Sequence, residues 1–206
     1  EYKIELLNTK LQDYNSRLYE QLEEQPLDSE IISGYINKHI LEDLRVTLID
    51  AEGNVVAEQE TPASQTVASF EIENVHLWHG KKDPYLYTAE VCLKSEDEVL
   101  DNVSTRFGCR TFEIHPENGF ILNGEEYPLR GVSRHQDRWG IGNALLKEHH
   151  DEDMDLICEV GATTIRLAHY QHDQYFYDLC DERGMVIWAE IPYISTHTVS
   201  YTHLTL

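Results

Sequence analysis

The feature that most constrains the fold of this chain is a change in hydrophobic periodicity near Pro116. Before this point, short segments rich in β-branched residues alternate apolar and polar side chains, which is typical of strands with one buried face. No helical period separates these segments, so the pattern favours a β-sandwich. The predicted strands cover residues 45–50, 55–58, 66–72, 85–93, 99–103 and 110–114.

After Pro116 the pattern changes to apolar strands that alternate with amphipathic helices. A hairpin over residues 120–126 has Asn123-Gly124 at its turn, a pair that favours tight hairpin turns. The alternation predicts a βαβαβ unit with parallel strands, and three strands do not close a barrel. Strands are predicted over residues 127–132, 163–168 and 185–191; helices are predicted over 147–160, with Met154, Ile157 and Val160 inward, and over 174–183, with Phe176, Leu179 and Cys180 inward.

The first 44 residues leave two interpretations open. Leu11, Tyr14, Leu18 and Leu22 recur at helical spacing, whereas a sandwich would have its first strands in this region.

Charge and composition exclude several classes of protein. The formal net charge of −22 disfavours nucleic-acid binding, because phosphate backbones would be repelled. No apolar run approaches the roughly 20 residues that span a bilayer, so no membrane partner is expected. The first residues lack a signal peptide and an initiator Met, and a cytoplasmic location is weakly favoured. The four cysteines, Cys92, Cys109, Cys158 and Cys180, fit no zinc module and are expected to be buried free thiols.

Polar residues follow each of the three predicted parallel strands. In a parallel sheet, ligands gather beyond the carboxyl ends of the strands. Any one of these residues would more often be a salt-bridge partner, but their occurrence at three successive strand ends favours a binding site. Such groups can hydrogen-bond sugar hydroxyls and stack on a sugar ring. The residues expected to converge are Arg134, His135, Arg166, His169, Tyr170 and Glu190.

Two other groups have a structural and a functional interpretation. Residues 149–153, His-His-Asp-Glu-Asp, could bind a metal, but the solvated first turn of a helix is the favoured interpretation. Trp78, Tyr85 and Tyr87 could form a sugar platform, but packing in the sandwich core is favoured.

Several segments together resemble the family 2 glycoside hydrolases of the β-galactosidase type. The resemblance extends from about residue 45 to residue 198, and its combined motifs are specific. It is carried by Thr164–Tyr170, Asp181–Trp188, Arg130–His135, Leu77–Trp78, Asp83–Tyr87 and Phe107–Thr111.

The resemblance implies an immunoglobulin-like β-sandwich over residues 1–114 and the first three βα units of an incomplete (β/α)₈ TIM barrel over 115–198. It further implies a multidomain enzyme that hydrolyses terminal β-D-galactosides with retention, and that is in some cases a homo-oligomer. By resemblance, the residues that bind the substrate are His135, His169, Arg166, Tyr170 and Glu190.

The sequence departs from the family pattern at several positions. Thr164 replaces an Asn, Gln171 replaces a Pro, and Ser133 replaces the Asn of the first barrel strand. The parent enzyme could use Mg²⁺ or Na⁺. However, residues 194–197, Ile-Ser-Thr-His, lack the Glu of the family's magnesium motif, so no metal ligand or cofactor is assigned here.

Catalysis by this chain alone is not expected. A retaining glycosidase needs two carboxylates about 5 Å apart. The resemblance places both beyond the third barrel strand, and the sequence has no Asn-Glu pair, which marks the family's acid/base. Residues 199–206 resemble a non-native tail, which is consistent with a fragment. The alternatives are a fragment of a β-glucuronidase or β-mannosidase relative, or a non-catalytic carbohydrate-binding or scaffold module.

Overall fold

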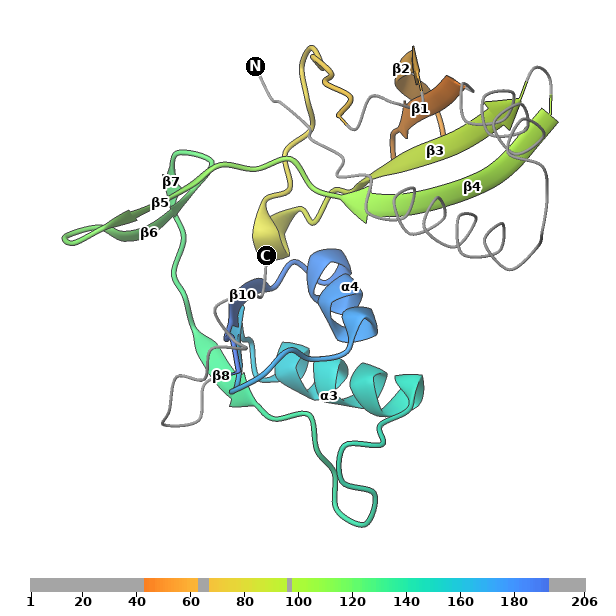
Figure 1. The fold of residues 1–206 in the computed structure, drawn as a ribbon. Helices are drawn as coiled ribbons and strands as arrows, with labels where there is room; N and C mark the ends of the chain where they lie inside the picture. The colour runs from red at the N-terminus through yellow and green to blue at the C-terminus, as the bar shows by residue number, and fades with distance from the viewer. Residues whose placement is uncertain (1–42, 63–66, 96–97, 193–206) are drawn as a thin grey trace. The chain divides into compact units, whose positions relative to one another are not determined.

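A computed structural model describes residues 43–62, 67–95 and 98–192 (Figure 1). The chain divides into two compact units, Glu1–Val75 with Tyr87–Phe107, and His76–Leu86 with Gly108–Leu206. The helical spacing over residues 11–24 and the predicted tail over 199–206 lie outside the described residues.

The first unit contains a four-stranded antiparallel sheet with the order β2-β1-β3-β4. The Asp50 carboxylate accepts hydrogen bonds from the backbone N–H groups of Glu52 and Asn54 at 3.0 and 2.7 Å, which fixes the β1–β2 turn. The strands confirm four of the predicted segments. They are β1 (Asp43–Ile49), β2 (Val55–Pro62), β3 (Tyr87–Ser95) and β4 (Glu98–Phe107).

The strand predicted over residues 66–72 is wrong for the part that the structure describes, because residues 67–72 carry no strand. Ala68 and Phe70 are nevertheless buried, and they pack against Val46, Leu48 and Ala89 of the sheet. A segment that lies across a sheet buries alternate side chains without pairing. The alternation therefore identified core positions correctly and the backbone pairing incorrectly.

The second unit contains a small antiparallel sheet of β5 (Phe112–His115), β6 (Gly119–Leu122) and β7 (Glu125–Glu126). The predicted strand 110–114 therefore pairs with β6 instead of completing the sandwich. Asn123 and Gly124 form the predicted turn, with φ of 53° and 81°.

Trp78 belongs to the core of this second unit, contrary to its predicted place in the sandwich. It packs with Leu122 and Tyr127, and its indole N–H donates to the carbonyl of Asp181 at 2.9 Å. The short helix η1 (Gly80–Lys82) follows it along the chain. The Trp motif thus fastens residues 76–86 to the parallel α/β part of the unit.

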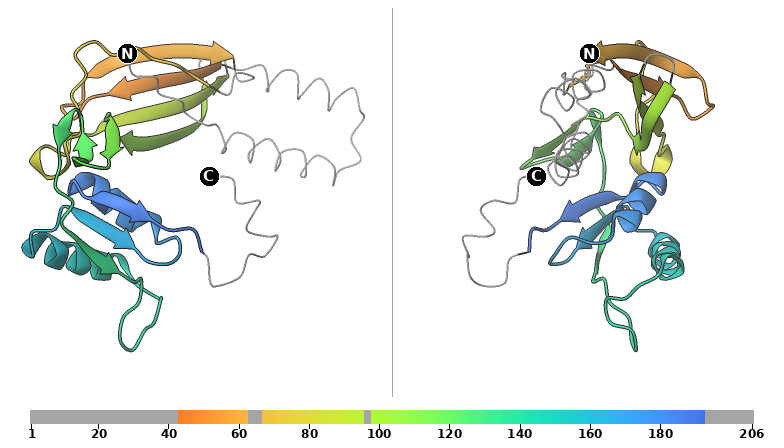
Figure 2. Two further views of the ribbon diagram at one scale, coloured as in Figure 1. Left: turned by 90° about the vertical axis from the view of Figure 1, so that its left-hand side faces the viewer. Right: turned by 45° about the vertical axis from the view of Figure 1, so that its right-hand side comes forward.

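The rest of the second unit is the predicted βαβαβ arrangement. The parallel sheet has the order β8-β9-β10, formed by β8 (Gly131–Arg134), β9 (Thr164–Leu167) and β10 (Val186–Ala189). In Figure 2, α3 (Lys147–Glu159) and α4 (Gln174–Glu182) lie on the same side of this sheet. The core between sheet and helices consists of Met154, Ile165, Leu167, Phe176, Leu179, Cys180 and Met185.

Two smaller predictions have mixed outcomes. Val160 is 71% exposed instead of inward, because it caps α3 beyond the helix's last turn. All four cysteines are free, and Cys92, Cys109 and Cys180 are buried, as predicted; Cys158 is half-buried. Burial raises the pKa of Cys180 to about 12, so this thiol stays protonated.

No helix of the described residues is long and apolar enough to span a membrane.

Candidate functional site

The direction of each side chain at the site follows from its place in the parallel sheet. Ser133, Arg166 and Trp188 are paired across β8, β9 and β10, and all three are exposed on the face that the helices leave open. Their neighbours along the strands face the other way, because successive side chains point to opposite faces. Arg134 and Leu167 accordingly face the helices and are buried.

An ion-paired cluster lies on the open face at the carboxyl ends of β9 and β10. Arg166 donates to both carboxylate oxygens of Glu190, from Nε at 2.7 Å and from Nη2 at 3.2 Å. Its Nη1 donates to Ser133 Oγ at 3.1 Å. These three contacts hold the guanidinium in one orientation, because its donors form a rigid fork.

His169 joins this cluster through Nδ1, which lies 3.2 Å from a Glu190 oxygen and 3.4 Å from Arg166 Nη2. A carboxylate can only accept, and its contact is the shorter one, so Nδ1 carries the proton and donates to Glu190. In the neutral imidazole, Nε2 is then an acceptor. The His169 side chain is 54% exposed, so this acceptor can meet a ligand hydroxyl.

Two further rings extend the cluster. The His135 ring lies 5.1 Å from that of His169 at an interplanar angle of 65°, and 6.5 Å from that of Tyr170. Tyr170 is held in turn, because its hydroxyl accepts from the backbone N–H of Gln136 at 3.1 Å. We call Ser133, His135, Arg166, His169, Tyr170 and Glu190 the rim cluster.

The charge state of Glu190 limits what the rim cluster can do. Hydrogen bonding to Arg166 and its positive charge hold the pKa of Glu190 below the ordinary value, and burial opposes this only partly. A general acid that protonates a leaving group at neutral pH needs a raised pKa instead. Glu190 is therefore suited to accepting hydrogen bonds and to fixing Arg166 and His169.

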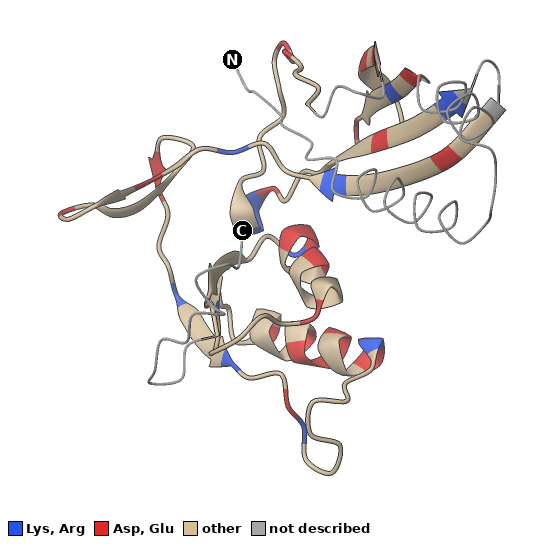
Figure 3. Cartoon of the chain, in the orientation of Figure 1, with Lys and Arg blue, Asp and Glu red and all other residues tan. Residues whose placement is uncertain are grey.

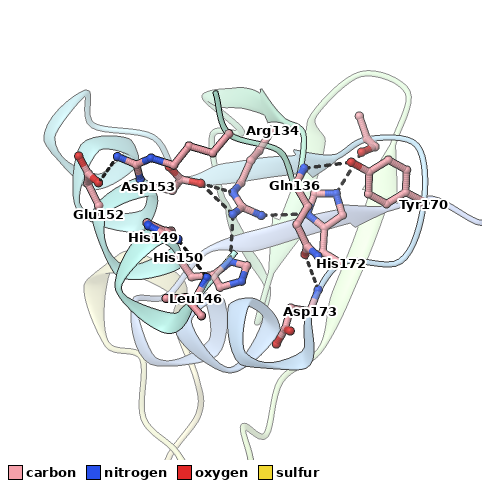
Figure 4. A network of polar contacts seen from close by, with 12 residues as sticks. Arg134, Gln136, Leu146, His149, His150, Glu152, Asp153, Tyr170, His172 and Asp173 are labelled. Carbon is pink, nitrogen blue, oxygen red and sulfur yellow. Dashed lines mark hydrogen bonds and ion pairs between the residues drawn. The ribbon is translucent and has the colours of Figure 1, made fainter. Parts of the chain in front are cut away.

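Five of the six residues expected at the strand ends are brought together, and Arg134 is not. The prediction for Arg134 was wrong, because this residue is the last of β8 and faces the helices. Its guanidinium lies 3.8 Å above the ring of Phe176 and pairs with Asp153 at 2.8 Å (Figure 4). Ser133, which occupies the opposite face, contacts Arg166 in its place.

Residues 149–153 are not simply the solvated helix turn that their charge predicted. Figure 3 shows acidic residues along α3, yet His150 is only 2% exposed. Its Nδ1 accepts from Arg134 Nη2 at 3.0 Å, while the Asp151 carboxylate accepts from the Tyr175 hydroxyl at 2.8 Å. His150 and His172 were not identified as partners of Arg134 from the sequence. Counting positions along β8 is the signal that would have placed Arg134 toward the helices, but it does not identify these two partners.

The rim cluster offers little to a metal ion. Its single carboxylate is already engaged by a guanidinium, and the described residues contain no group of three or more His, Cys, Asp or Glu placed to hold a metal. A divalent cation would need several free oxygen ligands. The arrangement is instead one of hydrogen-bond donors, acceptors and ring faces, which suits a polar organic ligand.

Polar groups at the carboxyl ends of parallel strands are typical of the sites of α/β enzymes, in barrels and in open sheets alike. Residues 112–205 match the family model described as "Glycosyl hydrolases family 2, TIM barrel domain", and residues 8–110 match "Glycosyl hydrolases family 2". The chain belongs to glycoside hydrolase family 2. It combines the immunoglobulin-like domain with the start of the barrel domain, and the described residues form no closed barrel.

The relatives differ in the activity that their names give. A β-glucuronidase of Bacteroides fragilis is 46% identical over 123 residues, which are 60% of this chain and 18% of that protein. A β-galactosidase of Thermoanaerobacter pseudethanolicus is 35% identical over 150 residues, 70% of this chain and 20% of that protein. The crystal structure of a putative β-galactosidase from Bacteroides fragilis is 45% identical, with a TM-score of 0.70, over 73% of this chain and 24% of that one. The chain thus spans about a quarter or less of these proteins.

Proposed function

We propose that this chain forms part of the sugar-binding wall of a longer, retaining β-glycosidase that releases a terminal β-linked sugar. The observation that carries the proposal is the rim cluster. Three successive parallel strands end beside one another, and their polar groups make contacts of 2.7–3.4 Å within the cluster. Sugar hydroxyls are recognised by such fixed donors and acceptors, and sugar rings pack on exposed aromatic faces.

Within the rim cluster we assign each residue a role. His169 Nε2 and the outer lone pairs of Glu190 accept from sugar hydroxyls, while Arg166 keeps Glu190 ionised and oriented. His135 and Tyr170 limit the space beside His169 through their ring contacts. These roles concern binding and orientation.

A β-glucuronide is the substrate class that we favour, and a β-galactoside is the second candidate. The 46% identity to a protein named β-glucuronidase supports the first. The second is supported by the 35% identity to a β-galactosidase and by the solved structure named a putative β-galactosidase. The rim cluster itself does not separate them, because Arg166, the cation of this cluster, is neutralised by Glu190.

The catalytic carboxylates are proposed to lie on later barrel strands. Retention needs an acid/base and a nucleophile about 5 Å apart. Glu190 fits neither role well, because its pKa is lowered and Arg166 occupies both of its oxygens. We therefore predict that the 206-residue chain alone does not hydrolyse a chromogenic β-glucuronide or β-galactoside above a buffer control.

The full-length protein that contains this chain provides the test. We expect kcat/KM for 4-nitrophenyl β-D-glucuronide to exceed that for the β-D-galactoside, and Glu190→Gln to lower it by roughly 10- to 100-fold, the loss of a charged hydrogen-bond acceptor. Glu159→Gln, which removes an exposed carboxylate at the end of α3, is the matched control and should leave the value unchanged. A larger value for the galactoside would select the second candidate. Hydrolysis of neither glycoside, or an unaffected Glu190→Gln variant, would contradict the proposal.

A further inference from the structure

A buried histidine lies between the rim cluster and the helices. His172 is 6% exposed and belongs to the connection between β9 and α4. Its Nδ1 lies 3.1 Å from Arg134 Nη1, and its Nε2 lies 3.0 Å from the carbonyl oxygen of Ala168 (Figure 4). Both ring nitrogens are thus satisfied by groups of the protein, and neither is left for a ligand.

These two contacts fix the tautomer of His172. A guanidinium has no acceptor, so Arg134 must donate and Nδ1 must carry a lone pair. A carbonyl oxygen can only accept, so Nε2 carries the proton and donates to Ala168. A neutral ring with the proton on Nε2 is the one form that satisfies both contacts. Burial together with the nearby positive charge of Arg134 holds the pKa of His172 below 6.5, which favours this form at neutral pH.

Arg134 is a rigid anchor for this ring. Its Nε and Nη2 both reach Asp153, at 2.9 and 2.8 Å, and Nη2 also donates to His150 at 3.0 Å. The plane of the guanidinium lies on Phe176. We call Arg134, His150, Asp153 and His172 the Arg134 network. Because partners on α3 and the ring of Phe176 on α4 hold Arg134, the position of His172 is fixed relative to the sheet.

The other side of His172 contacts the turn that carries the rim residues. Ala168 immediately precedes His169, and its N–H donates to the Arg134 carbonyl at 3.1 Å while its own carbonyl accepts from His172. The His172 ring also lies 5.3 Å from the ring of Tyr170. His172 therefore contacts the turn immediately before and immediately after His169.

We infer that His172 is a positioning residue for the rim cluster: it holds residues 168–170 against the buried Arg134, and thereby sets where His169 and Tyr170 meet the sugar. The inference rests on the proposed function for its consequence in catalysis, but its geometric part does not depend on that function. Small displacements of a binding group are costly, since a shift of about 1 Å can lower the rate by about 100-fold.

The first test is ¹⁵N NMR of the imidazoles and backbone amides in the full 206-residue chain at neutral pH. We expect a neutral His172 with the proton on Nε2 and a lone pair on Nδ1. In His172→Phe the resonances of His169 and Tyr170 should shift, and in His172→Gln, whose amide N–H can still donate to Ala168, they should stay near their wild-type positions. A protonated His172, the reverse tautomer, or unmoved His169 and Tyr170 resonances in His172→Phe would overturn the inference. If a variant fails to fold, the tautomer of His172 in the wild-type chain still tests the inference.

The second test is the activity of the full-length protein. We expect His172→Phe to lower kcat/KM by roughly tenfold or more, with recovery in His172→Gln. His115→Phe, a substitution on the exposed β5 strand, is the control and should have no effect. Equal losses in His172→Phe and His172→Gln, or no loss in either, would overturn the role in catalysis. If the wild-type protein hydrolyses neither glycoside, the proposed function fails, and the NMR result still decides whether His172 positions the turn.

Discussion

At the scale of single residues, Arg166 determines the charge state of the rim cluster. Its hydrogen bonds and charge are the main cause of the lowered pKa of Glu190. We predict that Arg166→Gln raises this pKa toward the ordinary value of 4.5, because glutamine keeps a donor but loses the charge. The pKa is read from the ¹³C shift of the Glu190 carboxyl group during a pH titration.

Arg183→Gln is the matched control for this substitution. Arg183 pairs with Asp155 at 2.9 Å in the same unit, and both side chains are exposed. Its loss should leave the Glu190 titration unchanged. An unchanged Glu190 pKa in Arg166→Gln would show that the ion pair of the structure is not formed in solution.

Single residues also show where sequence reasoning succeeded and where it failed at the site. Five rim residues could be predicted, because parallel strands present their carboxyl ends at a common edge. Arg134 could not be placed by its position near a strand end, since one step along a strand reverses the face. The partners of Arg134 come from α3 and from the turn before α4, so only the three-dimensional packing identifies His150 and His172.

At the scale of elements, the two helices end in glycines that have the same conformation but different surroundings. Gly161 follows α3 with φ of 78°, and a Cβ there would meet nothing within 4 Å. Gly184 follows α4 with φ of 69°, and a Cβ there would collide with the backbone of Gly80. Substitutions at these two glycines therefore separate two contributions to the loss of stability: that of the left-handed backbone conformation and that of the close approach to another segment.

We predict that Gly161→Ala lowers the free energy of unfolding by about 1 kcal/mol, the cost of the left-handed conformation alone. Gly184→Ala should lower it by about 3 kcal/mol, because forced displacement of packed backbone adds about 2 kcal/mol. Urea titration of both variants measures the difference. Equal losses would mean that residues 80 and 184 are not in contact in solution.

Elements were predictable to the extent that their pattern was local. Both helices of the barrel part and its three strands follow from apolar spacing and from glycines at their ends. Residues 67–72 show the limit of this reasoning. Alternate burial is a property of packing on a sheet, whereas strand pairing depends on a neighbour elsewhere in the chain, and the sequence pattern contains no information on that neighbour.

At the scale of the whole molecule, the division into units does not follow the order of the sequence. In the sequence, residues 76–86 come between strands of the first unit. In the structure they belong to the second unit, where Trp78 contacts Leu122 and Tyr127. Sequence reasoning assigned Trp78 to the nearest predicted sandwich strands. Trp78 contacts residues more than 40 positions away in the sequence, and this contact depends on how the apolar cluster packs in three dimensions.

The Arg134 network makes the stability of the second unit depend on pH. Burial lowers the pKa of His150 and of His172 from 6.5, and the charge of Arg134 adds to this. The unfolded chain therefore binds protons at a higher pH than the folded chain does. This part of the stability is fully present above about pH 6.5 and is lost as the pH falls toward the folded pKa values. The charged or titratable groups that face the two rings are Arg134, His135, Asp151, Asp153 and Asp173.

We predict that the melting temperature of the chain falls as the pH is lowered from about 7.5 to 5. The melting temperature of His150→Gln should fall less steeply over this range, because one of the two protonation sites is removed. Glutamine can still accept from Arg134, which limits the loss of packing. His149→Gln is the control, because His149 is next to His150 in the chain but lies outside the Arg134 network. The melting temperature of this variant should depend on pH as that of the wild type does. Differential scanning calorimetry over this range provides the measurement. A melting temperature that rises on acidification, or the same slope in wild type and His150→Gln, would mean that the buried imidazoles are not neutral in the folded chain.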